Sequence, residues 1–188
     1  MKKEELKEGD IIFIAIKYML YRQVAKGTGS KASHIGIVLK DANGNWQVAE
    51  SAVPFSKYCS YDEFLKRSEN GWYCIKRLKT PISEEALSRI KKECNERMGV
   101  LYHLGFKYHS KRLFCSKFVY QVFQSALGVE IGRLETFQQL YDRMPYISLF
   151  FWRFWYLGFI PWSRVTITPA SQMESELLET IYEARRVR

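Results

Sequence analysis

Two short stretches decide the fold: residues 33–39, S-H-I-G-I-V-L, and residues 114–120, F-C-S-K-F-V-Y. The first alternates in the way a half-buried β-strand does. The second opens an amphipathic helix, with apolar residues every three or four positions. A thiol in the first turn of a helix and an imidazole on a nearby strand supply the nucleophile and the base of cysteine catalysis. His34 and Cys115 are therefore the candidate catalytic pair.

Cys115 also fits a hydrophobic core, because cysteine is often buried and this helix carries an apolar stripe through Phe118 and Val122. For a lone cysteine on such a stripe, core packing is favoured. Its first-turn position favours the catalytic interpretation, because free N–H groups and the helix dipole stabilise a thiolate there. The Cys115 N–H would also donate to an oxyanion. Nearby cations add to this effect on the thiolate: Lys107, Lys111, Arg112 and Lys117.

A hairpin connects His34 to the third candidate, Glu50. The Asn-Gly pair within residues 41–45 predicts a turn between two antiparallel strands. That turn places His34 opposite position 53, so a bulge or a different loop length is needed to bring Glu50 to the imidazole. Glu50 would then orient the imidazole as the third member of a triad. On composition alone, a solvated strand residue is an equally good interpretation of Glu50.

Gly36 lies on the same face of the predicted strand as His34. A glycine inside a strand often marks close approach by another group. We expect Gly36 to leave room for a substrate or a helix. Without Cys115, an ordinary strand-edge histidine would be the preferred interpretation of His34.

The whole pattern predicts an α+β fold, a small and mainly antiparallel sheet packed against helices. Strands are expected at residues 10–16, 34–40, 46–51, 72–78 and 164–168. Helices are expected from the capping box at Ser60 to about Ser68, between Ser83 and Gly99, at 115–127 and at 136–144, with a short one beginning at 18–21. Residues 100–114 form a loop.

The aromatic run at residues 147–162, I-S-L-F-F-W-R-F-W-Y-L-G-F-I-P-W, has two interpretations. As core, it covers the sheet while Arg153 extends to solvent. As a functional surface, it lies on a membrane or holds an acyl chain. The core interpretation is favoured, because large aromatic residues dominate the buried area of small domains.

The formal net charge is +9, from 29 basic and 20 acidic residues. This charge favours anionic partners such as lipid head groups or cell-wall polymer, or equally describes a solvated basic surface. Nothing beyond charge resembles a nucleic-acid module, so no nucleic-acid partner is expected. A metal set of His103, His109 and Cys115 is disfavoured, because paired ligand spacings are missing. We expect neither a metal nor a cofactor.

The N-terminus lacks the pattern of a signal peptide, and no stretch reaches the roughly 18 apolar residues of a membrane span. We expect a cytoplasmic protein, with peripheral membrane association as an alternative. The four cysteines are then expected to be thiols.

Five motifs, in order, are similar to those of the YiiX/YebB-like hydrolases, in the circularly permuted branch of the papain-like NlpC peptidases. They are L-K-E-G-D-I-I-F, S-H-I-G-I-V-L, V-A-E-S-A-V-P, Y-H-L-G-F-K-Y and F-C-S-K-F-V-Y. The later W-R-F-W-Y-L-G-F-I-P-W and T-I-T-P-A-S resemble the YebB side of the family. The resemblance covers about residues 6–170.

The resemblance implies that Cys115 is the nucleophile, His34 the base and Glu50 the third polar member. It implies a permuted papain-like domain over residues 1–170, followed by a tail at 171–188 that is a peripheral helix or frayed. Tyr102 matches a tyrosine that lines the substrate cleft, and His103 follows it where many YiiX-like members carry Asp. Ser33 and Ser116, beside the catalytic candidates, are also predicted to contact substrate.

Three functions remain open. The first is a cysteine hydrolase of amide bonds, acting on cell-wall-derived peptides through an acyl-enzyme. The second is a thiol acyltransferase or lipid hydrolase that uses the aromatic run for an acyl chain. The third is a non-catalytic binding module for anionic surfaces, with Cys115 buried. The expected substrate is therefore a peptide or an acyl lipid, and the expected surface partner is an anionic membrane.

Overall fold

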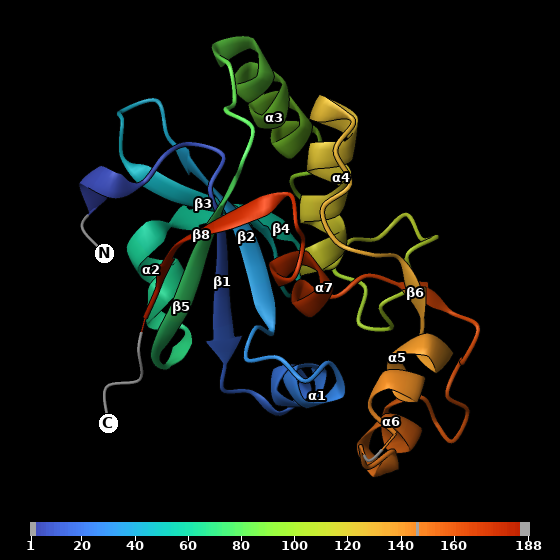
Figure 1. Ribbon diagram of the computed structural model, residues 1–188. Coiled ribbons are helices and arrows are strands. Elements are labelled where there is room, and N and C mark those ends of the chain that lie inside the picture. The colour runs from blue at the N-terminus through green and yellow to red at the C-terminus, as the bar shows by residue number, and fades with distance from the viewer. Residues whose placement is uncertain (1–2, 146, 185–188) are drawn as a thin grey trace.

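An antiparallel sheet forms the centre of the protein, with its strands in the order β4-β3-β2-β1-β5-β8 (Figure 1). The structure is a computed structural model that describes residues 3–145 and 147–184. The strands of this sheet are β1 Ile11–Ile16, β2 His34–Lys40, β3 Trp46–Ser51, β4 Ser56–Ser60, β5 Ser68–Leu78 and β8 Leu178–Glu183. A separate short pair joins β6 Glu135–Thr136 to β7 Val165–Thr166.

Helices pack on both sides of the sheet, which confirms the predicted α+β class. They are α1 Met19–Gly27, α2 Tyr61–Lys66, α3 Glu84–Glu96, α4 Cys115–Leu127, α5 Phe137–Arg143, α6 Phe150–Trp155 and α7 Pro169–Met173, with a 3-10 turn η1 at Lys3–Glu5. Successive side chains of β2 point to opposite faces of the sheet and therefore belong to two separate core clusters. Ile35, Ile37 and Leu39 join the cluster beneath α3 and α4, whereas Val38 packs with Phe64 of α2 on the opposite face.

Local sequence signals explain the ends of the main helices. Ser60 forms a complete capping box with Glu63 at the start of α2, and the Ser83 hydroxyl accepts from Ala86 N at the start of α3. These contacts satisfy N–H groups that a helix leaves free. α4 ends at Gly128, whose φ of 69° is the left-handed conformation that glycine adopts without strain.

The register of the β2–β3 hairpin brings His34 and Glu50 to one face without a bulge. Ile37 pairs with Ala49 and Lys40 with Trp46, with no register shift between them. Continuing this register places Glu50 opposite Gly36, two residues from His34 and on the same face. Diagonal neighbours of this kind lie within reach of a long side chain. The expected bulge is therefore wrong, whereas the alternative of a different loop length agrees with the structure, because the connection at 41–45 shifts the pairing by one residue from the expected register.

The room at Gly36 is occupied by the protein itself. A Cβ added there would lie 2.4 Å from Val48 Cγ1, 3.0 Å from the Ala49 carbonyl oxygen and 3.2 Å from Phe64 Cε2. The group that approaches closely is thus a side chain of helix α2 together with the neighbouring strand β3. This glycine lets Phe64 pack directly over the hairpin that carries the candidate site.

Several elements differ from the sequence prediction. The final strand is shorter than residues 164–168, because only Val165–Thr166 pair with β6. β4 was not predicted. Residues 178–183 form β8, which pairs with β5 at the edge of the sheet, so a helix or frayed end is wrong for them. Residues 185–188 of the predicted tail lie outside the described residues.

The aromatic run does not cover the sheet. Its central helix α6 lies beside α5 at one end of the molecule, away from the sheet (Figure 1). None of the α6 side chains is buried, and Phe150 and Phe154 are 83% and 77% exposed. The core interpretation is therefore wrong for these residues. Among the described helices, none is long and apolar enough to cross a bilayer.

Substitution of Gly36 by Ala should destabilise the protein by about 1–3 kcal/mol, because the added methyl overlaps Val48 and Phe64. Chemical denaturation measures the change in the free energy of unfolding. In a Val48→Ala background the cost should fall, since the nearest clashing atom is gone. Equal costs in the two backgrounds would contradict the close approach.

Candidate active site

Cys115 is the first residue of α4. Phe114 precedes it in an extended conformation and makes no side-chain cap, and Phe118 N donates to the Phe114 carbonyl at 2.9 Å to close the first turn. The N–H groups of Cys115, Ser116 and Lys117 therefore precede the helical ladder, as at any helix start. The Cys115 side chain is nearly buried, yet it lines a cavity. This is the first-turn position that the sequence predicted.

His34 and Glu50 form a direct and fully buried contact. His34 Nε2 lies 2.5 Å from Glu50 Oε2, and both side chains are 0% exposed. Bonding through Nε2 leaves Nδ1 for another partner, and Nδ1 has no hydrogen bond among the described residues. An imidazole held at one nitrogen and free at the other is arranged as a general base requires.

Two aromatic rings fix the plane of the His34 imidazole. Phe64 stacks on it with ring centroids 5.5 Å apart, and Tyr21 meets it edge-on at 5.7 Å. Phe64 comes from α2 and Tyr21 from α1, so one residue from each of two helices packs against the imidazole of His34. Neither residue was predicted to belong to the site, because only tertiary packing brings them to β2.

The charges at the site favour a protonated His34. Burial alone lowers the pKa of His34, but the negative charges of Cys115 and Glu50 outweigh it and raise the pKa to about 9. Burial likewise raises the pKa of Glu50, but His34 and Arg67 outweigh it and lower the pKa to about 2. The imidazolium of His34 and the carboxylate of Glu50 thus stabilise each other. Cys115 and Glu50 are thus the two groups that raise the pKa of His34.

Arg67 is a fourth charged residue that the sequence analysis missed. Its Nη2 donates to Glu50 Oε1 at 2.7 Å, and the Cys59 thiol donates to the same oxygen at 3.2 Å. One oxygen of Glu50 thus faces His34 while the other faces Arg67. Arg67 follows α2 directly, and no motif marks it. Only the docking of α2 against β3 and β4 could have indicated its role.

Tyr102 lies beside the thiol and lines the same cavity. Its hydroxyl is 3.9 Å from Cys115 Sγ. Burial and then the negative charge of Cys115 raise the pKa of Tyr102 well above its usual value. The phenol therefore stays protonated at neutral pH and keeps a proton to donate.

The two predicted serines form part of the cavity wall. The Ser33 hydroxyl accepts from Ile16 N at 2.9 Å, and the Ser116 hydroxyl donates to the Ile167 carbonyl at 2.8 Å. Both residues line the cavity. Because each hydroxyl is bonded to the backbone, their observed contacts are structural, and their contact with substrate stays a prediction.

Of the cations that the sequence places near the thiol, Lys117 contacts the loop that precedes α4. Lys117 donates to the carbonyls of Ser110 and Arg112, the latter at 2.9 Å, and burial lowers the pKa of this lysine to about 8. The lysine therefore holds the loop before α4 in place.

Among the described residues, no group of three or more His, Cys, Asp or Glu is arranged to hold a metal ion.

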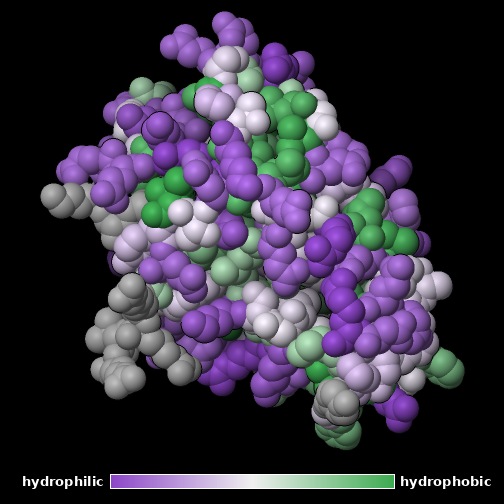
Figure 2. Space-filling view, in the orientation of Figure 1, coloured by the Kyte–Doolittle hydropathy of each residue, from purple (hydrophilic) through white to green (hydrophobic). Residues whose placement is uncertain are grey.

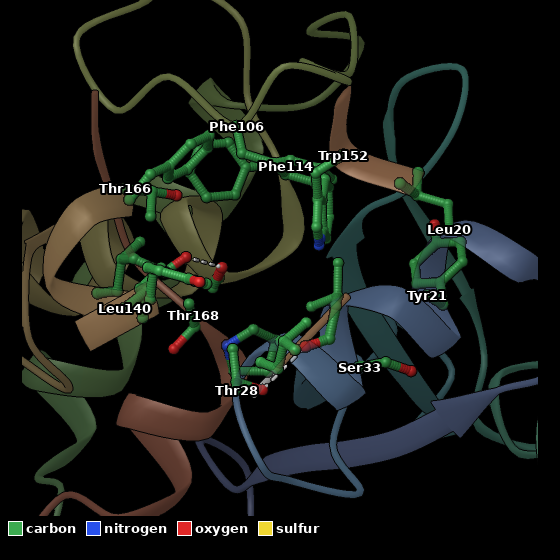
Figure 3. A pocket seen from close by; sticks show the side chains of 18 of the residues that line it. Leu20, Tyr21, Thr28, Ser33, Phe106, Phe114, Leu140, Trp152, Thr166 and Thr168 are labelled. Atoms are coloured by element: carbon green, nitrogen blue, oxygen red, sulfur yellow. Dashed lines mark hydrogen bonds between the residues drawn. The ribbon is translucent and has the colours of Figure 1, made fainter. Parts of the chain in front are cut away.

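A large apolar cavity begins at Cys115. Its open space is about 880 Å³, counted out to solvent. None of the described residues that line it is charged, and most are aliphatic or aromatic. In Figure 3, Leu20 and Tyr21 of α1, Leu140 of α5 and Trp152 of α6 surround a common space.

The fold and this geometry match a known family. Its model, described as "Permuted papain-like amidase enzyme, YaeF/YiiX, C92 family", matches residues 5–182. The chain belongs to this family. The match reaches into β8, which agrees with the pairing of that strand in the sheet. Membership in the YaeF/YiiX family confirms the resemblance read from the motifs.

Two relatives in the YaeF/YiiX group show the extent of the similarity. The "Uncharacterized protein YiiX" of Escherichia coli K12 is 24% identical over 173 residues, 92% of this chain and 84% of the relative. A crystal structure described as metalloprotein yiiX from Escherichia coli O157:H7 is 23% identical, with a TM-score of 0.84 over 96% of this chain and 98% of that one. The structural likeness establishes the permuted papain-like fold.

Cys115 should react with iodoacetamide much faster than the other three cysteines at about pH 6, as ion-paired thiolates do. Burial comes first among the causes that raise the pKa of Cys59 to about 12, of Cys74 to about 11 and of Cys94 to about 12, so these thiols stay protonated. Mass spectrometry of digested protein locates each label.

His34→Ala should remove this fast reaction at Cys115, whereas His109→Ala, which alters an exposed loop histidine, should leave it unchanged. Equally slow labelling of all four cysteines in the unmodified protein would favour the binding-module interpretation.

Proposed function

We propose that the protein is a cysteine amidase in which Cys115 is the nucleophile, His34 the general base and acid, and Glu50 the residue that orients His34. The observation that carries this proposal is the buried 2.5 Å contact between His34 Nε2 and Glu50 Oε2, which leaves Nδ1 of the same imidazole without a hydrogen bond among the described residues. Family membership supports amide-bond hydrolysis by a papain-like enzyme.

The reaction proceeds in two halves. With the proton of the Cys115 thiol held on His34 Nδ1, the thiolate attacks the amide carbonyl carbon. The imidazolium then protonates the amide nitrogen as the C–N bond breaks, which releases an amine and leaves a thioester on Cys115. Water attacks the thioester, His34 accepts its proton and returns it to the sulfur, and a carboxylic acid leaves.

The oxyanion of each tetrahedral intermediate needs two donors. We assign one to the backbone N–H of Cys115, which precedes the hydrogen-bonded turns of α4. We assign the second to the Tyr102 hydroxyl, which lies 3.9 Å from the sulfur and remains protonated because burial raises the pKa of Tyr102. This gives Tyr102 a chemical role in addition to lining the cleft.

The lining of the cavity favours an apolar acyl group in the substrate. Cell-wall peptides, the substrate expected from the sequence, carry several charges that a cavity without charged walls would not bind well. We therefore propose an amide whose acyl side is a long aliphatic or aromatic chain. In this arrangement the acyl group lies along Leu20, Leu140 and Trp152, and the amine leaves toward solvent.

The same cavity favours a second candidate function, a thiol acyltransferase or lipid hydrolase. An ester would form the same thioester at Cys115, and an alcohol or amine would replace water in the second half-reaction. The acceptor distinguishes the two functions, because the first half-reaction is common to both.

The proposal uses no metal. The term metalloprotein describes the Escherichia coli O157:H7 relative. In this chain the imidazole of His34 and the carboxylate of Glu50 are bonded to each other, and no described cluster of three donors exists near the thiol. The donor set therefore fits a triad and does not fit a metal site.

Cys115→Ala should abolish formation of the acyl-enzyme, measured as a mass increase on the intact protein after incubation with fatty-acyl amides and cell-wall peptides. Full activity in Cys115→Ala would contradict the mechanism.

His34→Ala should lower kcat/KM by about 10²- to 10⁴-fold, the usual contribution of a general base.

Activity should fall as pH rises through about 9, because a neutral His34 cannot protonate the leaving amine.

Leu140→Trp should shorten the acyl chains that the enzyme accepts, because the larger ring fills the cavity that Leu140 lines. The measurement is kcat/KM for a series of fatty-acyl amides of increasing length. Gln138→Trp provides the matched control, since this exposed residue of α5 does not line the cavity. The same loss for short and long chains would argue against acyl binding along Leu140.

A further inference from the structure

The aromatic segment carries apolar side chains on two opposite sides. On one side Leu149, Trp152, Tyr156 and Ile160 line the cavity. On the other side four large apolar side chains face solvent, and each is more than three-quarters exposed. These are Phe150 at 83%, Phe154 at 77%, Leu157 at 88% and Phe159 at 86%, here called the apolar tip.

An exposed apolar cluster of this kind is unusual on a protein whose whole surface is in contact with water. Exposed apolar residues are common singly, but a cluster within ten residues marks a surface that another apolar phase covers. A helix that is apolar on all sides is normally buried. Figure 2 shows apolar side chains projecting at the lower right end of the molecule, where α6 lies in Figure 1.

Hydrogen bonds attach the segment that carries the apolar tip to the loop before α4, and ring stacking joins aromatic side chains within that segment. Trp155 Nε1 donates to the Leu104 carbonyl at 3.0 Å, and the Tyr156 hydroxyl donates to the Gly105 carbonyl at 3.2 Å. Trp155 also stacks on Phe151, and Trp152 stacks on Tyr156. The rings that face inward are therefore fixed to the loop before α4, and the four outward side chains are presented together.

The charge around the apolar tip is positive. Residues 143–164 contain no Asp or Glu, and of their three arginines Arg143 pairs with Glu135, which leaves Arg153 and Arg164; the contacting loop adds Lys107. Arg153 is exposed and forms no ion pair with the described residues. Apolar side chains with arginine and lysine around them match the two layers of an anionic bilayer surface, acyl chains below and phosphates above.

We propose that the apolar tip inserts into the interface of an anionic lipid bilayer, with Arg153 at the level of the head groups. α6 has only six residues, so it lies in the interface and does not span it. A second copy of this chain is a poorer occupant, because both copies carry a net charge of +9 and repel each other.

Insertion of the apolar tip would place the cavity beside the acyl chains of the membrane. The side chains that line the cavity and those of the apolar tip are interspersed along residues 149–160. An apolar substrate would then reach Cys115 from the bilayer without crossing water. Membrane docking itself does not depend on the proposed amidase chemistry.

Vesicle sedimentation tests the proposal with the full chain. The protein should bind vesicles of phosphatidylcholine mixed with phosphatidylglycerol more tightly than vesicles of phosphatidylcholine alone, and added salt should weaken binding. The double variant Phe150→Asp with Phe154→Asp should bind about 100-fold more weakly, or about tenfold for each ring withdrawn from the interface. Leu177→Asp, at an exposed leucine just before β8, is the matched control and should bind as the unmodified protein does.

Three results would overturn membrane docking: no binding of the unmodified protein to either vesicle, undiminished binding of the double variant, or a dimer in gel filtration that the double variant loses. The last result would assign the apolar tip to a second copy. Circular dichroism and the labelling rate of Cys115 check that the double variant is folded. Cys115→Ala should bind vesicles normally, so failure of the amidase proposal and failure of docking are separate outcomes.

Discussion

The buried contact between His34 and Glu50 is the interaction on which the site depends. Both side chains are fully removed from water, and an unpaired charge in that position would be strongly destabilising. The contact is stable because Glu50 also accepts from Arg67, and because Phe64 and Tyr21 pack against the imidazole. Two helices and a hairpin therefore converge on one polar pair, and their packing sets the orientation of the only imidazole nitrogen left for the thiol.

The cavity and the triad are built from different parts of the chain. The triad uses β2, β3 and the start of α4, which lie in the sheet and the helix packed on it. The cavity wall comes mainly from α1, α5 and the aromatic segment, which lie beyond the edge of the sheet (Figure 1). This division separates chemistry from specificity. Under the proposed function, changes in the aromatic segment would alter the acyl group that is accepted while the sheet keeps the geometry of the proposed triad fixed.

Local sequence patterns predicted the elements that carry the triad with little error. The strand at residues 34–40 and the helix at 115–127 have the predicted bounds, because alternation, an Asn-Gly turn and a terminal glycine are signals within the chain itself. Motif order also identified the family. The strand at 178–183 was missed, since it is an edge strand whose partner β5 lies a hundred residues earlier.

Residue type and spacing were enough to name Cys115, His34 and Glu50, because a first-turn thiol, a strand imidazole and a hairpin acid are each visible locally. Only the tertiary structure brought Arg67, Tyr21 and Phe64 to that site, since their positions depend on how α1 and α2 pack against the sheet. The aromatic segment is a second case in which the sequence alone did not predict the tertiary environment. Its composition indicates buried area, but its exposure was decided by the absence of a described neighbour over Phe150 and Phe154. Burial is a property of what packs around a residue, and sequence records that only indirectly.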